Sequence, residues 1–296
     1  MNNITFEGSW AALVTPFKNG AIDQQALYRL LDVHLSAKTD GLVICGTTGE
    51  SATLSADEKA SLMKTVADRV SGKVKLVFGT GGNDTAHAVE LTRKAADLGA
   101  QGVLVVTPYY NKPTQTGLIA HFTHIAQATP LPVILYNVPG RTGVNMACAT
   151  TLELARLPNV KAVKEASGNL EQIMDILRGA PKGFELLSGD DALNFAIMAL
   201  GATGCISVTA NVDPKRMKAF TDAARAKEWD KARTIHFELL DLHRAMFIES
   251  NPIPAKTALH LMGHVGNEFR LPLVPAAEAT RERIAKTLER MGLLPC

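Results

Sequence analysis

A lysine stands at the end of one apolar run of this 296-residue chain. Lys164 closes the run 159–164, and the polar stretch 165–169 follows it directly. A buried ammonium is costly unless it is paired or loses its proton, and a neutral lysine is the nucleophile of Schiff-base catalysis. An ion pair with Glu165 or with a loop carboxylate is the alternative, and the run by itself leaves both interpretations open.

Tyrosines gather at the ends of other strand-like runs. The chain has four tyrosines, and three of them, Tyr109, Tyr110 and Tyr136, fall at such ends. Tyr136 has the parity of Ile134 within its run, so an inward Tyr136 would lie beside Lys164. A hydrogen-bonded core tyrosine is the alternative. A phenol that faces an amine and a threonine hydroxyl is also a workable proton relay.

Two further polar segments are candidates for binding carboxylates. The stretch 46–51, Gly-Thr-Thr-Gly-Glu-Ser, combines hydroxyls with glycines just before a helix capped at Ser55. Backbone N–H groups of such a turn can bind a small carboxylate, and the threonine hydroxyls add donors. Arg141 follows the tyrosine-ended run and can bind a second carboxylate in a bidentate manner. Most glycine-rich turns are only turns and most isolated arginines lie at the surface, so both assignments depend on their neighbours.

Eight apolar runs alternate with amphipathic stretches and would position these side chains. Several runs are continuously apolar, as strands covered on both faces should be. The intervals fit one strand, one helix and two short loops, which favours a closed (β/α)8 TIM barrel over an open sheet. The active site of such a barrel lies at the carboxyl ends of its strands, so Lys164 falls in the site and Lys161, of opposite parity, at the outer surface. The runs begin near Gly8, Gly41, Val74, Gly102, Pro132, Val160, Phe184 and Gly204.

The C-terminal part of the chain carries no convincing strand and is predicted to be helical. We expect a catalytic barrel over residues 1–225 and a helical C-terminal domain over residues 226–296. No flexible linker separates the two, so the extension should pack on the barrel. Helices are predicted at 214–226, 228–248, 254–262 and 275–291.

Composition argues against several classes of function. The net charge of +2 and the lack of a basic run argue against a nucleic-acid partner. No stretch approaches the roughly 18 apolar residues of a membrane span, and the first residues lack the pattern of a secretory signal. The cysteines and histidines show no metal-ligand spacing. We expect a cytoplasmic protein without a resident metal, in which Asp190 and Asp191 cap a helix rather than hold a cation.

Five motifs in register resemble those of the pyruvate-dependent class I aldolases, the family of N-acetylneuraminate lyase and dihydrodipicolinate synthase. Two more stretches, 204–211 and 251–256, resemble the synthases of this family specifically, and the likeness extends over nearly the whole chain. The resemblance implies the same barrel with a helical C-terminal domain. The five motifs are residues 46–50, 107–111, 136–142, 164–168 and 187–191.

The resemblance also implies roles for individual residues. Lys164 would form the Schiff base with pyruvate, with no further cofactor. Tyr136 would act as general acid and base in a relay with Thr47 and with Tyr110, which reaches in from the neighbouring subunit of a tight dimer. Two such dimers commonly make a homotetramer. The implied substrate-binding residues are Thr48 for the pyruvate carboxylate, Ile206 and Gly189 in the same pocket, and Arg141 for the carboxylate of L-aspartate 4-semialdehyde.

The implied reaction condenses pyruvate with L-aspartate 4-semialdehyde to 4-hydroxy-tetrahydrodipicolinate, in lysine and diaminopimelate biosynthesis. Another pyruvate aldolase, such as N-acetylneuraminate lyase or a 2-keto-3-deoxy sugar-acid aldolase, is the alternative within the family. Arg141 together with Tyr110 discriminates against it. A barrel that only senses a keto acid would be expected to lose Lys164 or Tyr136, and a metal-dependent aldolase would need ligand spacing that the sequence lacks.

One departure from the family pattern bears on regulation. In lysine-inhibited relatives a carboxylate binds the ammonium of the effector at the dimer interface, whereas His87 occupies that position here. A histidine cannot supply the same anion, so we predict weak or absent inhibition by lysine. Ser51, Ala52, Asn83 and Tyr109 still match the pattern, so a remnant of the effector pocket is expected.

Overall fold

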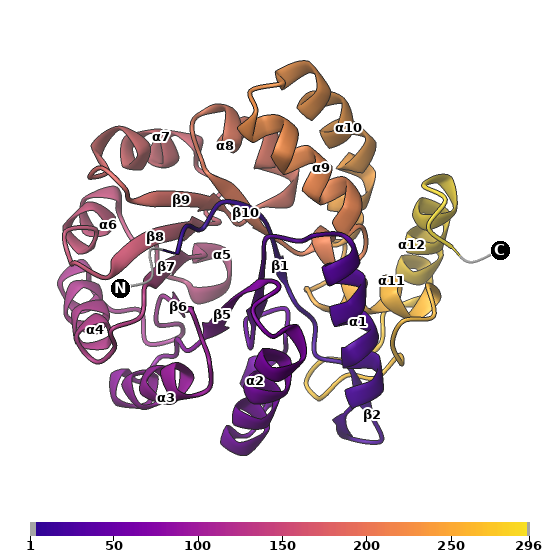
Figure 1. Ribbon diagram of the computed structural model, residues 1–296, viewed down its shortest axis with the longest axis horizontal. Helices are drawn as coiled ribbons and strands as arrows, with labels where there is room; N and C mark the ends of the chain where they lie inside the picture. Colours follow the sequence, from indigo (N-terminus) through magenta and orange to yellow (C-terminus); the bar gives the residue numbers. More distant parts are fainter. Residues whose placement is uncertain (1–3, 295–296) are drawn as a thin grey trace.

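The computed structural model describes residues 4–294 and shows a closed barrel of parallel strands (Figure 1). The barrel strands are β1 (Gly8–Ala12), β4 (Gly41–Ile44), β5 (Lys75–Gly79), β6 (Gly102–Val106), β7 (Val133–Asn137), β8 (Val160–Glu165), β9 (Glu185–Ser188) and β10 (Gly204–Ser207). They close in the order β1-β10-β9-β8-β7-β6-β5-β4. The predicted (β/α)8 architecture is confirmed, and each of these strands begins within one residue of its predicted start.

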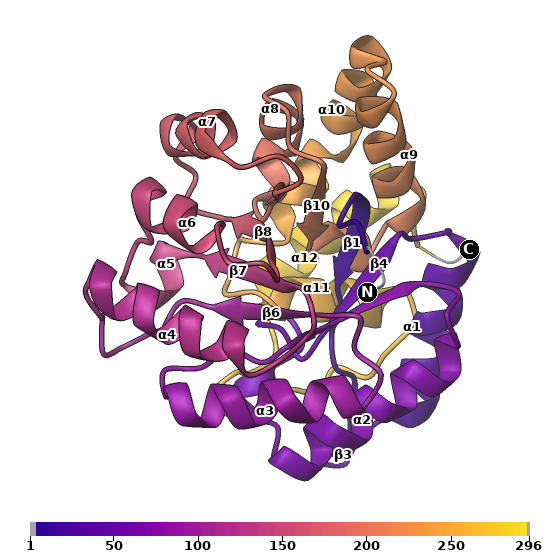
Figure 2. The same cartoon turned by 60° about the vertical axis from the view of Figure 1, so that its left-hand side comes forward.

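Helices cover the outside of the barrel, as the two views show together (Figure 2). Ser55 and Glu58 form the predicted capping box at the start of α2, with each side chain bonded to the other residue's backbone. The helices of the barrel part are α1 (Gln24–Ser36), α2 (Ala56–Val70), α3 (Thr85–Asp97), α4 (Gln115–Gln127), α5 (Pro139–Thr142), α6 (Cys148–Leu154), α7 (Leu170–Gly179), α8 (Asn194–Ala199) and α9 (Pro214–Arg225), with short 3-10 turns η1 (Ser51–Thr53), η2 (Asp191–Leu193) and η3 (Thr209–Asn211).

The structure contains a pair of short strands that the sequence analysis did not predict. A hairpin of β2 (Phe17–Lys18) and β3 (Ala21–Ile22) follows β1. Its turn residues, Asn19 and Gly20, have φ angles of 54° and 78°. Asn-Gly is the preferred pair for such a turn, so the signal was present in the sequence. Glu268 of the C-terminal extension accepts hydrogen bonds from both turn N–H groups.

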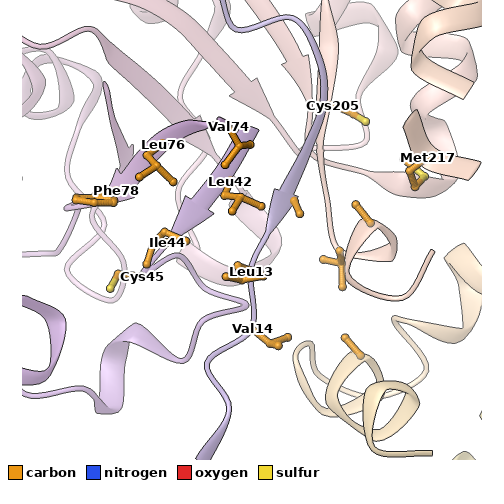
Figure 3. Packing of buried hydrophobic residues seen from close by; sticks show 14 of the residues in the cluster. Leu13, Val14, Leu42, Ile44, Cys45, Val74, Leu76, Phe78, Cys205 and Met217 are labelled. Carbon is orange, nitrogen blue, oxygen red and sulfur yellow. The ribbon is translucent and has the colours of Figure 1, made fainter. Parts of the chain in front are cut away.

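Alternation along the strands divides the buried side chains into two cores. Outward-pointing residues such as Leu42 and Ile44 of β4 belong to the core between barrel and helices, part of which Figure 3 shows. Val43, between them, points into the barrel, where it packs in the same cluster as Trp10. The indole of Trp10 fits because Gly41 has no side chain, since a Cβ there would lie 2.0 Å from its ring. Burial on both faces explains the uninterrupted apolar runs.

The C-terminal extension consists of the helices α10 (Trp229–Ala245), α11 (Ile253–Leu261) and α12 (Glu278–Arg290), and α10 packs along α9. These three helices and α9 confirm the four predicted ones. The proposed boundary between residues 225 and 226 falls at the end of α9, and the division into two domains stays a prediction. Within residues 4–294, none of the helices combines the length and apolarity that a membrane crossing requires.

A buried histidine makes the stability of this fold sensitive to acid. His34 of α1 is 1% exposed, with Nδ1 3.1 Å from the Thr39 hydroxyl. Burial lowers the pKa of His34 from 6.5 to about 4, so the unfolded chain binds this proton at higher pH than the folded chain. The stability that depends on the neutral imidazole is therefore complete above the unfolded pKa and is lost as the pH falls toward 4.

We predict that His34→Gln weakens this acid sensitivity. Between about pH 7 and about pH 5, the free energy of unfolding of the wild type should fall by about 2 kcal/mol more than that of the variant. Urea unfolding at the two pH values measures the difference. The exposed His87 offers a control, because His87→Gln should keep the wild-type dependence. An identical pH dependence in His34→Gln and wild type would contradict the prediction.

Candidate active site

Lys164 and Tyr136 meet inside the barrel, at the carboxyl ends of β8 and β7. The register of the two strands pairs them directly, and the Lys164 Nζ lies 4.1 Å from the centroid of the Tyr136 ring. Each side chain is buried, with 6% of its residue surface exposed. The prediction that an inward Tyr136 lies beside Lys164 is confirmed. Lys161, three residues earlier on β8, is exposed as predicted.

Glu165 does not neutralise Lys164, because successive residues of β8 point to opposite faces. Its carboxylate faces outward and accepts hydrogen bonds from Asn137 Nδ2, Gln172 Nε2 and the Ser167 N–H, at 3.1, 3.2 and 2.8 Å. Within residues 4–294, no carboxylate oxygen lies within 4.0 Å of the Lys164 ammonium. The ion-pair interpretation of Lys164 is therefore wrong, and a buried amine without a counter-charge remains.

A cavity of about 650 Å³ opens above this pair at the carboxyl ends of the strands. It brings together the catalytic candidates Thr47 and Tyr136, the carboxylate candidate Arg141, and the residues predicted as a remnant effector pocket. Lys164 itself is not part of the wall, so Tyr136 is the member of the pair that faces the cavity. The predicted residues on the wall are Thr47, Ser51, Ala52, Asn83, His87, Tyr109, Tyr136 and Arg141.

The turn after β4 places its two threonines differently. Thr47 lines the cavity, whereas Thr48 is 2% exposed and is not part of the wall. The Thr48 Oγ1 accepts a hydrogen bond of 2.9 Å from the Asn251 Nδ2. Arg141 of α5 is exposed, lines the cavity and donates from Nη2 to the Asn251 carbonyl at 3.1 Å. Sequence reasoning noted Asn251 only within a motif and assigned it no role, because its partners are distant in sequence.

Gly189 follows β9 and Ile206 belongs to β10, which are the next two strands of the barrel after β8. Ile206 of β10 is 1% exposed and shares the inner core with Tyr136. At Gly189, just after β9, an added Cβ would lie 2.8 Å from Lys164 Cε and 2.8 Å from Ala166 Cβ. Glycine at this position therefore provides the space that the Lys164 side chain occupies. Neither residue lines the 650 Å³ cavity.

Tyr110 does not join the site of its own chain. Its side chain is 88% exposed, its φ is +72°, and it is not part of the cavity wall. The structure of one chain therefore assembles Lys164, Tyr136 and Thr47 but leaves the predicted relay without its second tyrosine. That Tyr110 acts in a neighbouring subunit stays a prediction.

The prediction that Asp190 and Asp191 cap a helix is wrong. Neither side chain caps the 3-10 turn η2 that begins here. The Asp191 carboxylate instead accepts hydrogen bonds from the N–H groups of Val208 and Thr209, at 2.9 and 2.8 Å, and ties the end of β9 to the end of β10. In the described part of the chain, no group of three or more His, Cys, Asp or Glu side chains is placed to hold a metal ion.

Cys45 lines the cavity but is not a reactive thiol. It is 2% exposed, and burial raises its pKa to about 12. The thiolate, which is the nucleophilic form, is therefore absent at neutral pH. Among the side chains of this site, Lys164 is the candidate nucleophile.

The fold and the site together define a class, namely (β/α)8-barrel enzymes with a buried lysine beside a tyrosine at the carboxyl ends of the strands. The family model described as "Dihydrodipicolinate synthetase family" matches residues 5–291. The chain belongs to the dihydrodipicolinate synthetase family.

Individual relatives agree with this assignment. The 4-hydroxy-tetrahydrodipicolinate synthase of Geobacter metallireducens is 50% identical over 289 residues, which cover 98% of this chain and 100% of the relative. The crystal structure of dihydrodipicolinate synthase from Aquifex aeolicus matches with a TM-score of 0.96 at 44% identity and covers 98% of this chain and 99% of its own. A structure described as the first monomeric dihydrodipicolinate synthase variant matches with a TM-score of 0.96 at 43% identity, over 98% of both chains.

We predict that Gly189→Ala abolishes most of the chemistry at Lys164 while the barrel stays folded. The new methyl group must displace the lysine side chain, and a shift of about 1 Å in a reacting group costs on the order of 100-fold in rate. The measurement is the rate of the lysine-dependent reaction beside a thermal unfolding curve. Gly140→Ala is the matched control, because a Cβ there has open space and should change neither. Wild-type activity in Gly189→Ala would contradict this account of the site.

Proposed function

We propose that this chain condenses pyruvate with L-aspartate 4-semialdehyde to give 4-hydroxy-tetrahydrodipicolinate, through a Schiff base on Lys164. The observation that carries the proposal is the buried Lys164 amine, which has Tyr136 beside it and no carboxylate within 4.0 Å among residues 4–294. The names of the similar proteins support it. The reaction would supply lysine and diaminopimelate biosynthesis, in the cytoplasm.

The first half of the reaction needs a neutral amine and a proton donor. Nζ of Lys164 attacks the keto carbon of pyruvate, the carbonyl oxygen takes up protons and leaves as water, and an imine remains. The Tyr136 hydroxyl, in a relay with Thr47, supplies and then removes protons at this centre. Loss of a methyl proton converts the imine into an enamine. The N–H groups of the turn 46–50 and the Thr48 hydroxyl bind the pyruvate carboxylate.

The second half joins the two substrates. The enamine carbon attacks the aldehyde carbon of L-aspartate 4-semialdehyde, and the aldehyde oxygen takes up a proton to become the hydroxyl group. The amine of that substrate then displaces Lys164 from the imine, which closes the ring and frees the enzyme. Arg141, at the cavity wall, binds the carboxylate of this substrate.

Borohydride trapping tests the covalent step. We predict that pyruvate and borohydride together leave a reduced pyruvyl adduct on the peptide that contains Lys164. Lys164→Ala should give no adduct, whereas Lys161→Ala, on the outer face of the same strand, should give the wild-type amount. Peptide mass mapping reads the result. An unmodified wild type, under conditions that trap a known class I aldolase, would refute the proposal.

The second substrate separates the proposed function from its rivals within the family. Condensation with L-aspartate 4-semialdehyde is the expected activity. A chain that forms the adduct but cleaves N-acetylneuraminate or a 2-keto-3-deoxy sugar acid instead would be the alternative aldolase.

We further propose that the active form is a homo-oligomer, a tetramer of two tight dimers, in which Tyr110 completes the partner's site. Tyr110 holds a φ of +72° and leaves a large aromatic ring 88% exposed. Such a backbone costs on the order of 1–3 kcal/mol in a residue other than glycine, and strain of this kind clusters at functional positions. Both features support an interface role for this loop.

Mixing of inactive variants tests the shared site. Lys164→Ala and Tyr110→Phe place their defects in the same site of a mixed dimer, so its other site is intact. Random exchange of equal amounts should therefore restore about a quarter of wild-type activity, given a two-fold symmetric dimer. The control pairs Lys164→Ala with Tyr136→Phe, which leaves no intact site and should restore nothing. Absence of recovery in the first mixture, with exchange shown by mass spectrometry, would exclude a Tyr110 shared between subunits.

The proposed weak response to lysine follows from His87. This exposed residue lies on the cavity wall together with Ser51, Ala52, Asn83 and Tyr109, and it offers no carboxylate to an ammonium group. We expect half-inhibition by lysine only above millimolar concentration, as steady-state assays would show. Half-inhibition below that concentration would overturn the expectation.

A further inference from the structure

Asn251, which precedes α11 in the C-terminal extension, contacts two segments of the candidate site. Its amide Nδ2 donates to the Thr48 Oγ1 at 2.9 Å, and its backbone carbonyl accepts from the Arg141 Nη2 at 3.1 Å. Thr48 belongs to the turn after β4 and Arg141 to the helix after β7. Asn251 is 6% exposed and therefore holds a fixed position between the two.

Lys256, in the first turns of α11, forms an ion pair with Glu50 at the end of the same threonine turn. Its Nζ lies 2.5 Å from the Glu50 Oε1, and both side chains are fully buried. The rings of Phe17 and Phe269 flank the ammonium at 4.4 and 4.6 Å. Glu50 ends the turn in the left-handed region, at a φ of +52°. Burial lowers the pKa of Lys256, and the charge of Glu50 opposes that shift.

The contact with Thr48 determines the direction of its hydroxyl proton. A threonine hydroxyl has one donor and two acceptor positions. Because Oγ1 accepts from Asn251, its own proton is left to donate elsewhere, and the bond restricts rotation about the side chain. A donor fixed in this way can bind a carboxylate without first losing rotational freedom.

We propose that Asn251 is a positioning residue, which orients the Thr48 hydroxyl toward the pyruvate carboxylate. Its backbone carbonyl, bonded to Arg141, also sets the distance between Arg141 and the threonine turn. The C-terminal extension is on this account part of the substrate site. The inference rests on the proposed function, because it assigns pyruvate to the Thr48 turn and the semialdehyde carboxylate to Arg141.

The hydrogen bonding of Asn251 separates this role from a purely stabilising one. The Asn251 Oδ1 is buried without a partner among the described residues. A buried acceptor without a partner offsets much of what the bond from Nδ2 contributes to stability. Removal of the whole amide should therefore leave the fold almost as stable as before, while Thr48 loses its orientation.

Asn251→Ala is the test, with Asn159→Ala as its matched control. Asn159 precedes β8 at the opposite end of the barrel, and its Nδ2 contacts the carbonyls of Ala126, Thr129 and Leu131. We expect Asn251→Ala to raise the pyruvate KM, and the pyruvate concentration that half-saturates borohydride trapping, by about tenfold. The KM for L-aspartate 4-semialdehyde should change by less than about twofold, because Arg141 keeps the backbone carbonyl of residue 251. Asn159→Ala should change neither constant.

A double-mutant cycle shows whether Asn251 acts through Thr48. In a Thr48→Val background, Asn251→Ala should raise the pyruvate constants by less than about twofold, because the group that it orients is already missing. Asn251→Ser replaces the alanine variant if that variant does not fold. Its hydroxyl is one bond shorter than the amide nitrogen and cannot reach Thr48, so we expect the same increase in the pyruvate constants.

The outcomes separate the inference from the function on which it rests. A normal wild-type adduct with unchanged pyruvate constants in Asn251→Ala would overturn the inference alone. So would an equal increase in Asn159→Ala, or a full tenfold effect in the Thr48→Val background. A wild type that forms no adduct would overturn both the inference and the proposed function.

Discussion

The alternation of β8 is the constraint on which this site depends. Successive residues of a strand face opposite sides, so Lys164 points into the barrel and Glu165 points away from it. The Glu165 carboxylate accepts hydrogen bonds from Asn137, Gln172 and the Ser167 N–H on the outer side. Among the described residues, no carboxylate oxygen lies within 4.0 Å of the amine in the interior.

Neighbouring residues of the barrel hold the Lys164 side chain in the interior. Gly189 leaves room for the lysine side chain, and Tyr136 lies against it from the neighbouring strand. Beneath them, Trp10 and the rest of the inner core fill the barrel with apolar side chains. The cavity lies at the carboxyl ends of the strands, where Thr47 and Arg141 are on the wall. Because the barrel is closed and its interior is filled, the site opens at the carboxyl ends of the strands.

The C-terminal extension contacts the end of the barrel at which the site lies. Asn251 contacts Thr48, Lys256 pairs with Glu50, and Arg270 pairs with Glu58 at the start of α2. Three links from one segment to a single stretch of the barrel fix the threonine turn in place. Removal of one member of the buried Lys256–Glu50 pair leaves an uncompensated charge, so this link is costly to break. The extension and the site consequently form one structural unit.

The sequence by itself determined the barrel strands and the inward direction of Lys164. Apolar runs bounded by polar residues placed each barrel strand within one residue, and parity along those runs placed Lys164 and Tyr136 inward, because both signals are local. It did not determine the bonds of Asp191 to the N–H groups after β10, the contact of Asn251 with Thr48, or the absence of Tyr110 from its own site. Those depend on which distant loops the closed barrel brings together. Only the tertiary structure decided them, because no periodicity within one segment records the position of another.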